Sequence, residues 1–155
     1  ANKVVALEEL LINVPDNYLI FYNYTPELYL ILGAADAAGY NTDIYNGEQK
    51  SLANFRKSEG KLGEKNLLIA NIASGSAALN LQKYKYVLFF ALPDMFKDYE
   101  QGIGRIERIG QKAKEITVIN FITKGTVEEK VWKSLQIGES YTDKMYSRDI
   151  IWRDL

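Results

Sequence analysis

The chain has 155 residues, with 19 lysines and arginines against 20 aspartates and glutamates, and it contains no cysteine or histidine. This length favours a single domain with its own hydrophobic core. The missing residue types rule out disulfides, thiol nucleophiles, imidazole bases and Cys/His metal sites, and with them serine–histidine triads, cysteine proteases and zinc enzymes. A carboxylate site for Mg²⁺ or Ca²⁺ would need a loop that the sequence does not contain, so we expect no metal site.

The apolar runs and the start of the chain bear on membrane association and cellular location. The longest apolar runs, 67–70 and 87–92, are far shorter than the roughly 20 residues that span a bilayer, so we expect no membrane partner. The start at Ala1 has no initiator methionine and no signal-peptide pattern, and we interpret it as a boundary within a longer protein. The missing signal and the missing cysteines favour a cytoplasmic location.

Apolar periodicity and turn residues predict secondary structure along the whole chain. In the first part of the chain they predict a helix at 4–12, a strand at 18–24, a helix from 25 to 38, a strand at 43–45 and a helix at 51–58. In the second part they predict strands at 67–71 and 86–91, a helix at 95–109, a strand at 116–123 and a helix from 126. Thr25 is the expected N-cap of the second helix, Pro26 lies at its first position, and Gly39 ends it.

Strands alternate with helices throughout, which predicts an α/β fold with a mostly parallel open sheet and helices on both faces. We expect residues 1–135 to form this domain. Residues 136–155 are polar and aromatic, and we expect them to form a C-terminal helical extension.

The segment at 98–111 carries the most informative motif. On a helix, Gln101, Arg105 and Arg108 fall within about 60° of one another, so the helix presents one amide and two guanidinium groups together. Gly102 and Gly104 each cost about 1 kcal/mol within a helix, which suggests that something approaches the backbone closely. Paired guanidinium groups suit a polyphosphate. A solvated helix face with two surface arginines is the alternative, and the residues alone leave both open.

Small residues at 71–82 directly follow a predicted buried strand. They leave backbone N–H groups available for phosphate or sugar at the carboxyl end of that strand, where α/β sheets usually bind ligands. A tight turn between strand and helix explains the same residues. The loop lysines Lys57, Lys61 and Lys65 are ordinary solubilising residues or nucleic-acid phosphate contacts.

These motifs resemble the C-terminal RecA-like lobe of superfamily-2 helicases, in the SWI/SNF-like DNA translocase branch and particularly its phage and bacterial members. The segment at 101–111 (Gln-x-x-Gly-Arg-x-x-Arg-Ile-Gly-Gln) matches motif VI of that branch, and 76–81 resembles motif V. Residues 19–24 resemble motif IV, and 125–129 (Gly-Thr-Val-Glu-Glu) match the segment after motif VI. The resemblance covers about residues 3–135 in the expected order.

The resemblance implies roles that spacing could not show. Arg105 and Arg108 are implied to be catalytic arginine fingers that contact the nucleotide phosphates. The other implied site residues are Gln101, Gly104 and Asn80 for nucleotide binding, and Asn71, Ser74 and Gly75 for nucleic-acid binding. In a helicase lobe, the loop lysines Lys57, Lys61 and Lys65 gain weight as phosphate contacts, so we also count them as nucleic-acid-binding residues.

The resemblance also implies ATP and Mg²⁺ as cofactors of the full-length enzyme, DNA (or RNA) as a partner, and an N-terminal RecA-like lobe that carries the P-loop. Neither a P-loop nor an acidic Asp-Glu-x-x box is present in this chain, since 60–66 lacks the Ser/Thr and precedes a strand. We therefore expect the chain alone to bind neither cofactor and to hydrolyse no ATP. The alternative is a stand-alone RecA-like module that binds nucleic acid or a partner without turnover.

Overall fold

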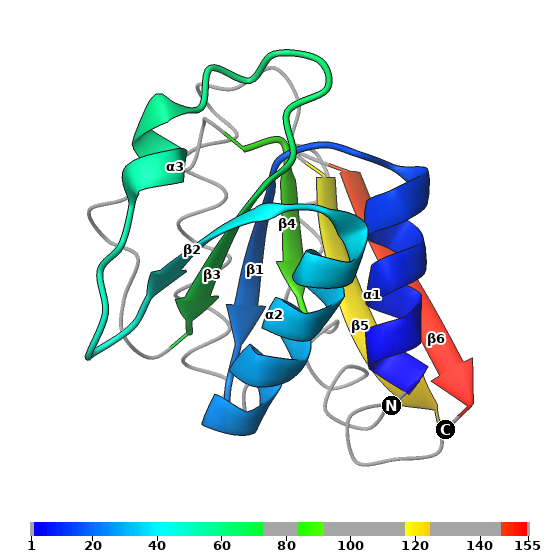
Figure 1. The fold of residues 1–155 in the computed structure, drawn as a ribbon. Coiled ribbons are helices and arrows are strands. Elements are labelled where there is room, and N and C mark those ends of the chain that lie inside the picture. Colours follow the sequence, from blue (N-terminus) through cyan, green and yellow to red (C-terminus); the bar gives the residue numbers. More distant parts are fainter. Residues whose placement is uncertain (1, 73–83, 92–116, 125–146, 155) are drawn as a thin grey trace.

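A parallel sheet forms the centre of the structure (Figure 1). The computed structural model describes residues 2–72, 84–91, 117–124 and 147–154. The helices are α1 (Asn2–Asn13), α2 (Thr25–Ala38) and α3 (Ala53–Lys57), and the strands are β1 (Tyr18–Tyr22), β2 (Asn41–Tyr45), β3 (Asn66–Asn71), β4 (Tyr86–Phe89), β5 (Thr117–Lys124) and β6 (Ser147–Asp154). The helices expected at 95–109 and from residue 126 lie outside the described residues.

The six strands pair in the order β2-β3-β1-β4-β5-β6, and every neighbouring pair is parallel. From β1 the chain first builds one side of the sheet, through β2 and β3. It then crosses to the other side of β1 and continues with β4, β5 and β6. This reversal next to β1 is a topological switch point, the place where open α/β sheets usually bind ligands.

Helices cover both faces of this sheet, as expected. Helices α1 and α2 lie side by side on one face, where their apolar side chains pack on Tyr18, Ile20 and Ile69 (Figure 1). The opposite face carries Leu19 and Leu68, which are also fully buried. A strand buried on both faces reads as a continuous apolar run, which explains why β1 and β3 were recognisable in the sequence.

Helix α3 packs on that opposite face, at the end of the sheet formed by β2. Asp43, which is in register with Leu68, is buried, and its carboxylate accepts hydrogen bonds from the backbone N–H groups of Phe55 (2.6 Å) and Asn54 (3.3 Å). The Phe55 ring meets the buried Tyr84 ring edge-on, with centroids 4.9 Å apart. Burial raises the pKa of Tyr84, an effect that Asp43 increases.

The start of α2 differs from expectation. The N-cap residue is Tyr24 rather than Thr25, and the Glu27 carboxylate accepts hydrogen bonds from the backbone N–H groups of Tyr24 (2.6 Å) and Asn23 (2.9 Å). Because Glu27 takes these donors, β1 ends at Tyr22, two residues earlier than predicted. The predicted end of α2 is confirmed, since Gly39 has a left-handed backbone with φ 77°.

The expectation of a helix over the last twenty residues is wrong for 147–154, which form β6. This strand pairs with β5 in parallel over all eight residues, from Thr117 opposite Ser147 to Lys124 opposite Asp154. The segment contains Ile150, Ile151 and Trp152, which favour strands, and β5 offers it a row of backbone donors and acceptors. The expected boundary between a domain and an extension stays a prediction.

Within the described part of the chain, none of the helices has the length and apolar character needed to cross a membrane.

Candidate nucleic-acid interface

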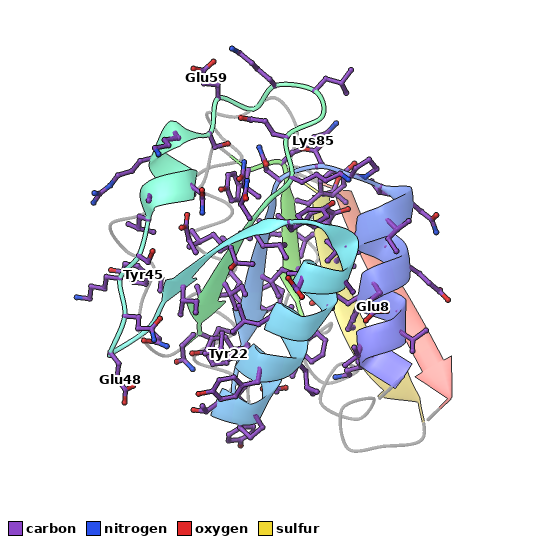
Figure 2. All side chains as sticks on the ribbon, in the orientation of Figure 1. Glu8, Tyr22, Tyr45, Glu48, Glu59 and Lys85 are labelled. Atoms are coloured by element: carbon purple, nitrogen blue, oxygen red, sulfur yellow. The ribbon has the colours of Figure 1, made fainter. Side chains whose placement is uncertain are left out.

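The carboxyl ends of β1, β2 and β3 meet at one edge of the sheet, which we call the carboxyl edge. An asparagine ends or directly follows each strand: Asn23, Asn46 and Asn71. Figure 2 shows Tyr22 and Glu48 at this end of the molecule, whereas Glu59 and Lys85 lie at the other end. Because β1 flanks the switch point, this edge is the first place to expect a ligand.

Hydrogen bonds of these amides shape the turns at the carboxyl edge. The Asn71 side chain donates to the Asn23 carbonyl oxygen (3.2 Å), which ties the end of β3 to the end of β1. The Asn46 side chain donates to the Tyr22 hydroxyl (3.2 Å) and accepts from the Glu48 backbone N–H (2.9 Å). These bonds shape the turn after β2, whose fixed geometry follows from an asparagine bonding its own downstream backbone.

Two further contacts lie at the carboxyl edge. The Lys50 ammonium lies 5.9 Å from the centre of the Tyr45 ring, beside a backbone bridge between the same two residues. The Lys3 ammonium donates to the Phe90 carbonyl oxygen (3.0 Å), so the first turn of α1 is bound to the chain that leaves β4. The exposed ring of Tyr24 adds an aromatic surface at the start of α2.

Most of the predicted site residues lie outside the described residues. These are Asn80, Gln101, Gly104, Arg105 and Arg108 for the nucleotide, and Ser74 and Gly75 for nucleic acid. Their roles stay predictions. Asn71, the described member of the motif V segment, lies at the carboxyl edge.

The predicted lysines are not at the carboxyl edge. Lys65 directly precedes β3, and its carbonyl oxygen accepts from the Asn41 backbone N–H at the start of β2 (3.0 Å). Lys57 ends α3, and Lys61 lies in the loop between these two positions. All three therefore lie at the amino ends of the strands, which we call the amino edge. With about 3.3 Å per residue, the six residues of β3 separate them from Asn71 by roughly 20 Å.

Glu64 organises the loop that carries the lysines, and sequence reasoning missed it. Its carboxylate accepts from the backbone N–H groups of Lys61 (3.0 Å) and Glu59 (3.2 Å), and from the side chain of Asn17 (3.1 Å). Burial raises the pKa of this carboxyl, but these donors outweigh it and hold the pKa below its usual value. The sequence signal that indicates this role is an acid, Glu64, that follows two glycines in a short loop.

Asn17 connects that loop to the sheet. It is buried just before β1, donates to the Ser58 hydroxyl (3.0 Å), and accepts from the backbone and side-chain N–H groups of Asn66 (both 3.0 Å). The amino edge is thus a polar network held from three elements. Within the residues that the structure describes, no group of three or more acidic side chains is placed to hold a metal ion.

The family described as "Helicase conserved C-terminal domain" matches residues 2–110. An uncharacterised ATP-dependent helicase of Bacillus subtilis, YqhH, is 29% identical over 135 residues, covering 86% of this chain and 24% of that protein. The DNA repair protein RAD5 of Cryptococcus neoformans is 31% identical over 120 residues, covering 74% of this chain and 10% of that protein.

A human relative named probable ATP-dependent RNA helicase DDX23 is 29% identical over 107 residues, covering 68% of this chain and 13% of that protein. The chain therefore spans no more than about a quarter of the length of these three relatives.

The crystal structure of the C-terminal part of the Fun30 ATPase domain superposes with a TM-score of 0.66 at 24% identity, covering 86% of this chain and 44% of that one. This likeness confirms the expected fold, a single RecA-like α/β domain with a parallel open sheet. Since the family match includes more than half of the 155 residues, the chain belongs to the helicase conserved C-terminal domain family.

Proposed function

We propose that this chain is the C-terminal lobe of an ATP-dependent helicase or translocase of the SWI/SNF-like branch, which acts on DNA. The observation that carries the proposal is the family match through residue 110, because it includes the segment with Gln101, Arg105 and Arg108. The names of two relatives, an ATP-dependent helicase and a DNA repair protein, support it. The phage or bacterial origin stays a prediction.

In this proposal, ATP lies between this lobe and an N-terminal lobe that carries the P-loop. Arg105 and Arg108 stabilise the charge that develops on the transferring phosphoryl group, with Gln101, Gly104 and Asn80 near the nucleotide. The two arginines contact phosphate only when the lobes close, so they also report the nucleotide state.

In this proposal, the ligands of Mg²⁺ come from the N-terminal lobe. Mg²⁺ requires oxygen ligands, usually one or two carboxylates with the phosphates of the substrate. The described residues of this chain bring no such acidic group together, so none of them is proposed as a ligand. When bound, the ion neutralises phosphate charge, and the contribution of this chain is limited to its arginines and amides.

Nucleic acid binds, in this proposal, along the carboxyl edge. Asn71 supports it, since its bond to Asn23 brings the ends of β1 and β3 together, and Ser74 and Gly75 follow Asn71 in the sequence. Backbone N–H groups and small polar side chains suit phosphate contacts, which position a strand without reading its sequence. Since one relative is named a probable RNA helicase, RNA is the comparison substrate.

Arginine substitutions in the full-length enzyme test the proposal. We expect Arg105→Ala and Arg108→Ala each to lower the kcat for ATP hydrolysis by about 10³- to 10⁵-fold, because that is the effect of arginine fingers in trans. The same changes should alter the stability of this chain by no more than about 0.5 kcal/mol. Steady-state ATPase assays with DNA and with RNA, and thermal melts of the chain, measure the two effects.

Ile106→Ala is the control for stability. At 100° per residue, Ile106 falls on the side of the expected helix that faces away from Arg105 and Arg108, where we expect it to be buried, so its truncation should cost about 2–5 kcal/mol. A normal melt with a full ATPase rate for Arg108→Ala would show that the finger role is wrong. A parent protein without any nucleic-acid-stimulated ATPase would instead favour the stand-alone binding module.

A further inference from the structure

The loop at 58–65, which joins α3 to β3, projects beyond the amino ends of the strands (Figure 1). At its tip, Leu62 has a relative exposure of 102%, the highest among the exposed large apolar side chains of the described residues. Leaving a leucine in water forgoes about 1.5–3 kcal/mol of the stabilisation that burial would provide. A single exposed leucine is common on protein surfaces, so the case depends on what holds it there.

Hydrogen bonds fix the loop on either side of Leu62. The Glu64 carboxylate accepts from the backbone N–H groups of Glu59 and Lys61 and from the Asn17 side chain, so it closes the loop around itself and binds it to the start of β1. Gly60 (φ 72°) and Gly63 (φ 91°) on either side have left-handed backbones that other residues rarely adopt. The tip is therefore built into a defined shape.

Basic side chains outnumber acidic ones at the amino edge, where the acids are Asp16, Glu59 and Glu64, although the whole chain has a net charge of −1. Glu64 is used inside the loop, and Glu59 pairs with the Lys61 ammonium at 2.6 Å, with both side chains more than 60% exposed. Such an exposed ion pair is weak and can be exchanged for another anion. The cations at this edge are Arg56, Lys57, Lys61, Lys65 and Lys85.

We propose that the loop at 58–65, together with Lys57 at the end of α3, is a second nucleic-acid contact. In this contact Lys57, Lys61 and Lys65 bind phosphates, and Leu62 packs against a sugar or a base. This inference rests on the proposed function and adds a surface to it. Lysines position a strand through its phosphates, and apolar tips contact bases in proteins that enter a groove. The roughly 20 Å between the two edges corresponds to about six nucleotides of one strand, so the bound segment is longer than the carboxyl edge alone requires.

An acidic protein partner fits this surface less well. A stable protein interface needs about 800 Å² on each side with an apolar centre, whereas Leu62 is flanked by two glycines and charged residues. Spaced cations around one apolar tip suit a polyanion whose charges repeat regularly.

Binding of labelled oligonucleotides to the 155-residue chain tests the inference. The probes are a single strand of about 20 nucleotides and a duplex of about 20 base pairs, measured by fluorescence anisotropy over a salt series. The variants are Lys57→Gln/Lys61→Gln/Lys65→Gln and Leu62→Ala. The matched control for Leu62→Ala is Leu30→Ala, because Leu30 is 45% exposed on α2.

We expect the triple lysine variant to reduce the slope of log affinity against log salt by about 2–3, since each phosphate contact contributes about 0.7–0.9. Leu62→Ala should weaken binding by about fivefold at unchanged slope, because it removes an apolar contact only. Leu30→Ala should bind like the wild type.

Wild-type affinity and slope in both loop variants would overturn the inference, as would a wild-type chain that binds neither probe. Competition by polyglutamate as effective per charge as by the oligonucleotide would point to an acidic peptide and overturn it too. These outcomes leave the arginine assays in the full-length enzyme unaffected, so failure of the loop contact and failure of the proposed function are distinguishable.

Discussion

The Glu64 carboxylate shows how one side chain can set the geometry of a surface far from the motifs that identify the family. It accepts hydrogen bonds from two backbone N–H groups of its own loop and from Asn17 at the start of β1. An acceptor with several donors is favoured in its charged form, which explains the lowered pKa of Glu64. The loop is thus most ordered when this group is ionised.

This predicts a pH dependence of stability. Since the pKa of Glu64 is lower in the folded state, its contribution is fully present above its ordinary pKa of 4.5 and is lost as the pH falls through the lowered value. We expect Glu64→Gln to lower the free energy of unfolding by about 1–2 kcal/mol at pH 7, because an amide replaces one acceptor by a donor. Urea denaturation at pH 7 and in acid measures it.

The difference between Glu64→Gln and the wild type should shrink in acid, where the wild-type carboxyl is protonated. Glu48→Gln is the control, because Glu48 is exposed at the turn after β2 and should change stability by less than about 0.5 kcal/mol. A constant difference across this pH range would contradict the role given to the ionised carboxylate.

At the scale of one element, α2 depends on its two glycines in opposite ways. Gly33 lies within the helix with open space where a Cβ would be, so it contributes only the conformational entropy of an unconstrained residue. Gly39 has equally open space but a φ of +77°, which an L side chain adopts at a cost. Space is the same at both positions, and only the backbone differs.

We therefore expect Gly33→Ala to raise the free energy of unfolding by about 0.5–1 kcal/mol and Gly39→Ala to lower it by about 1–2 kcal/mol. Thermal melts of the two variants test this directly. Gly47→Ala serves as the control, since this exposed turn position has open space and no positive φ. Equal changes in the free energy of unfolding for Gly33→Ala and Gly39→Ala would mean that helix propensity alone determines both effects. The left-handed backbone at the end of α2 would then make no contribution.

At the scale of the whole molecule, a parallel sheet gathers the ends of distant strands at two opposite edges. The ends of β1 and β3 are 49 residues apart in sequence (71 − 22) and adjacent in space, with Tyr22 in register with Asn71. The same geometry separates the lysine loop from Asn71, although both lie within 15 residues of each other (71 − 57). The lysine loop therefore lies at the amino edge and Asn71 at the carboxyl edge.

The chain alone should hydrolyse no ATP above background, with or without DNA. The reason is chemical: phosphoryl transfer needs a phosphate cradle, a metal ligand and a residue that positions water, and the sequence contains no P-loop or acidic box. A coupled-enzyme ATPase assay on the purified chain measures it, with the full-length protein as the positive control. ATP turnover that persists through repurification and disappears with Arg108→Ala would contradict this expectation.

Local patterns were enough to predict most of the elements. β1 and β3 were recognisable because strands buried on both faces need continuous apolar residues, and the end of α2 because only Gly39 tolerates the left-handed turn there. The family was recognisable from the residue types and spacing at 101–111, which need no knowledge of long-range contacts. These features depend on near neighbours in the chain.

Tertiary structure decided what depends on pairing between distant segments. The strand β6 forms along the edge that β5 offers, whereas the polar and aromatic composition of 136–155 as a whole led us to expect a helical extension. The strand order places β3 beside β1 and so brings Asn71 next to Asn23, a pairing that no local pattern contains. Asn17 and Glu64 meet across 47 residues of sequence, so their contact follows from the fold and from nothing in either segment.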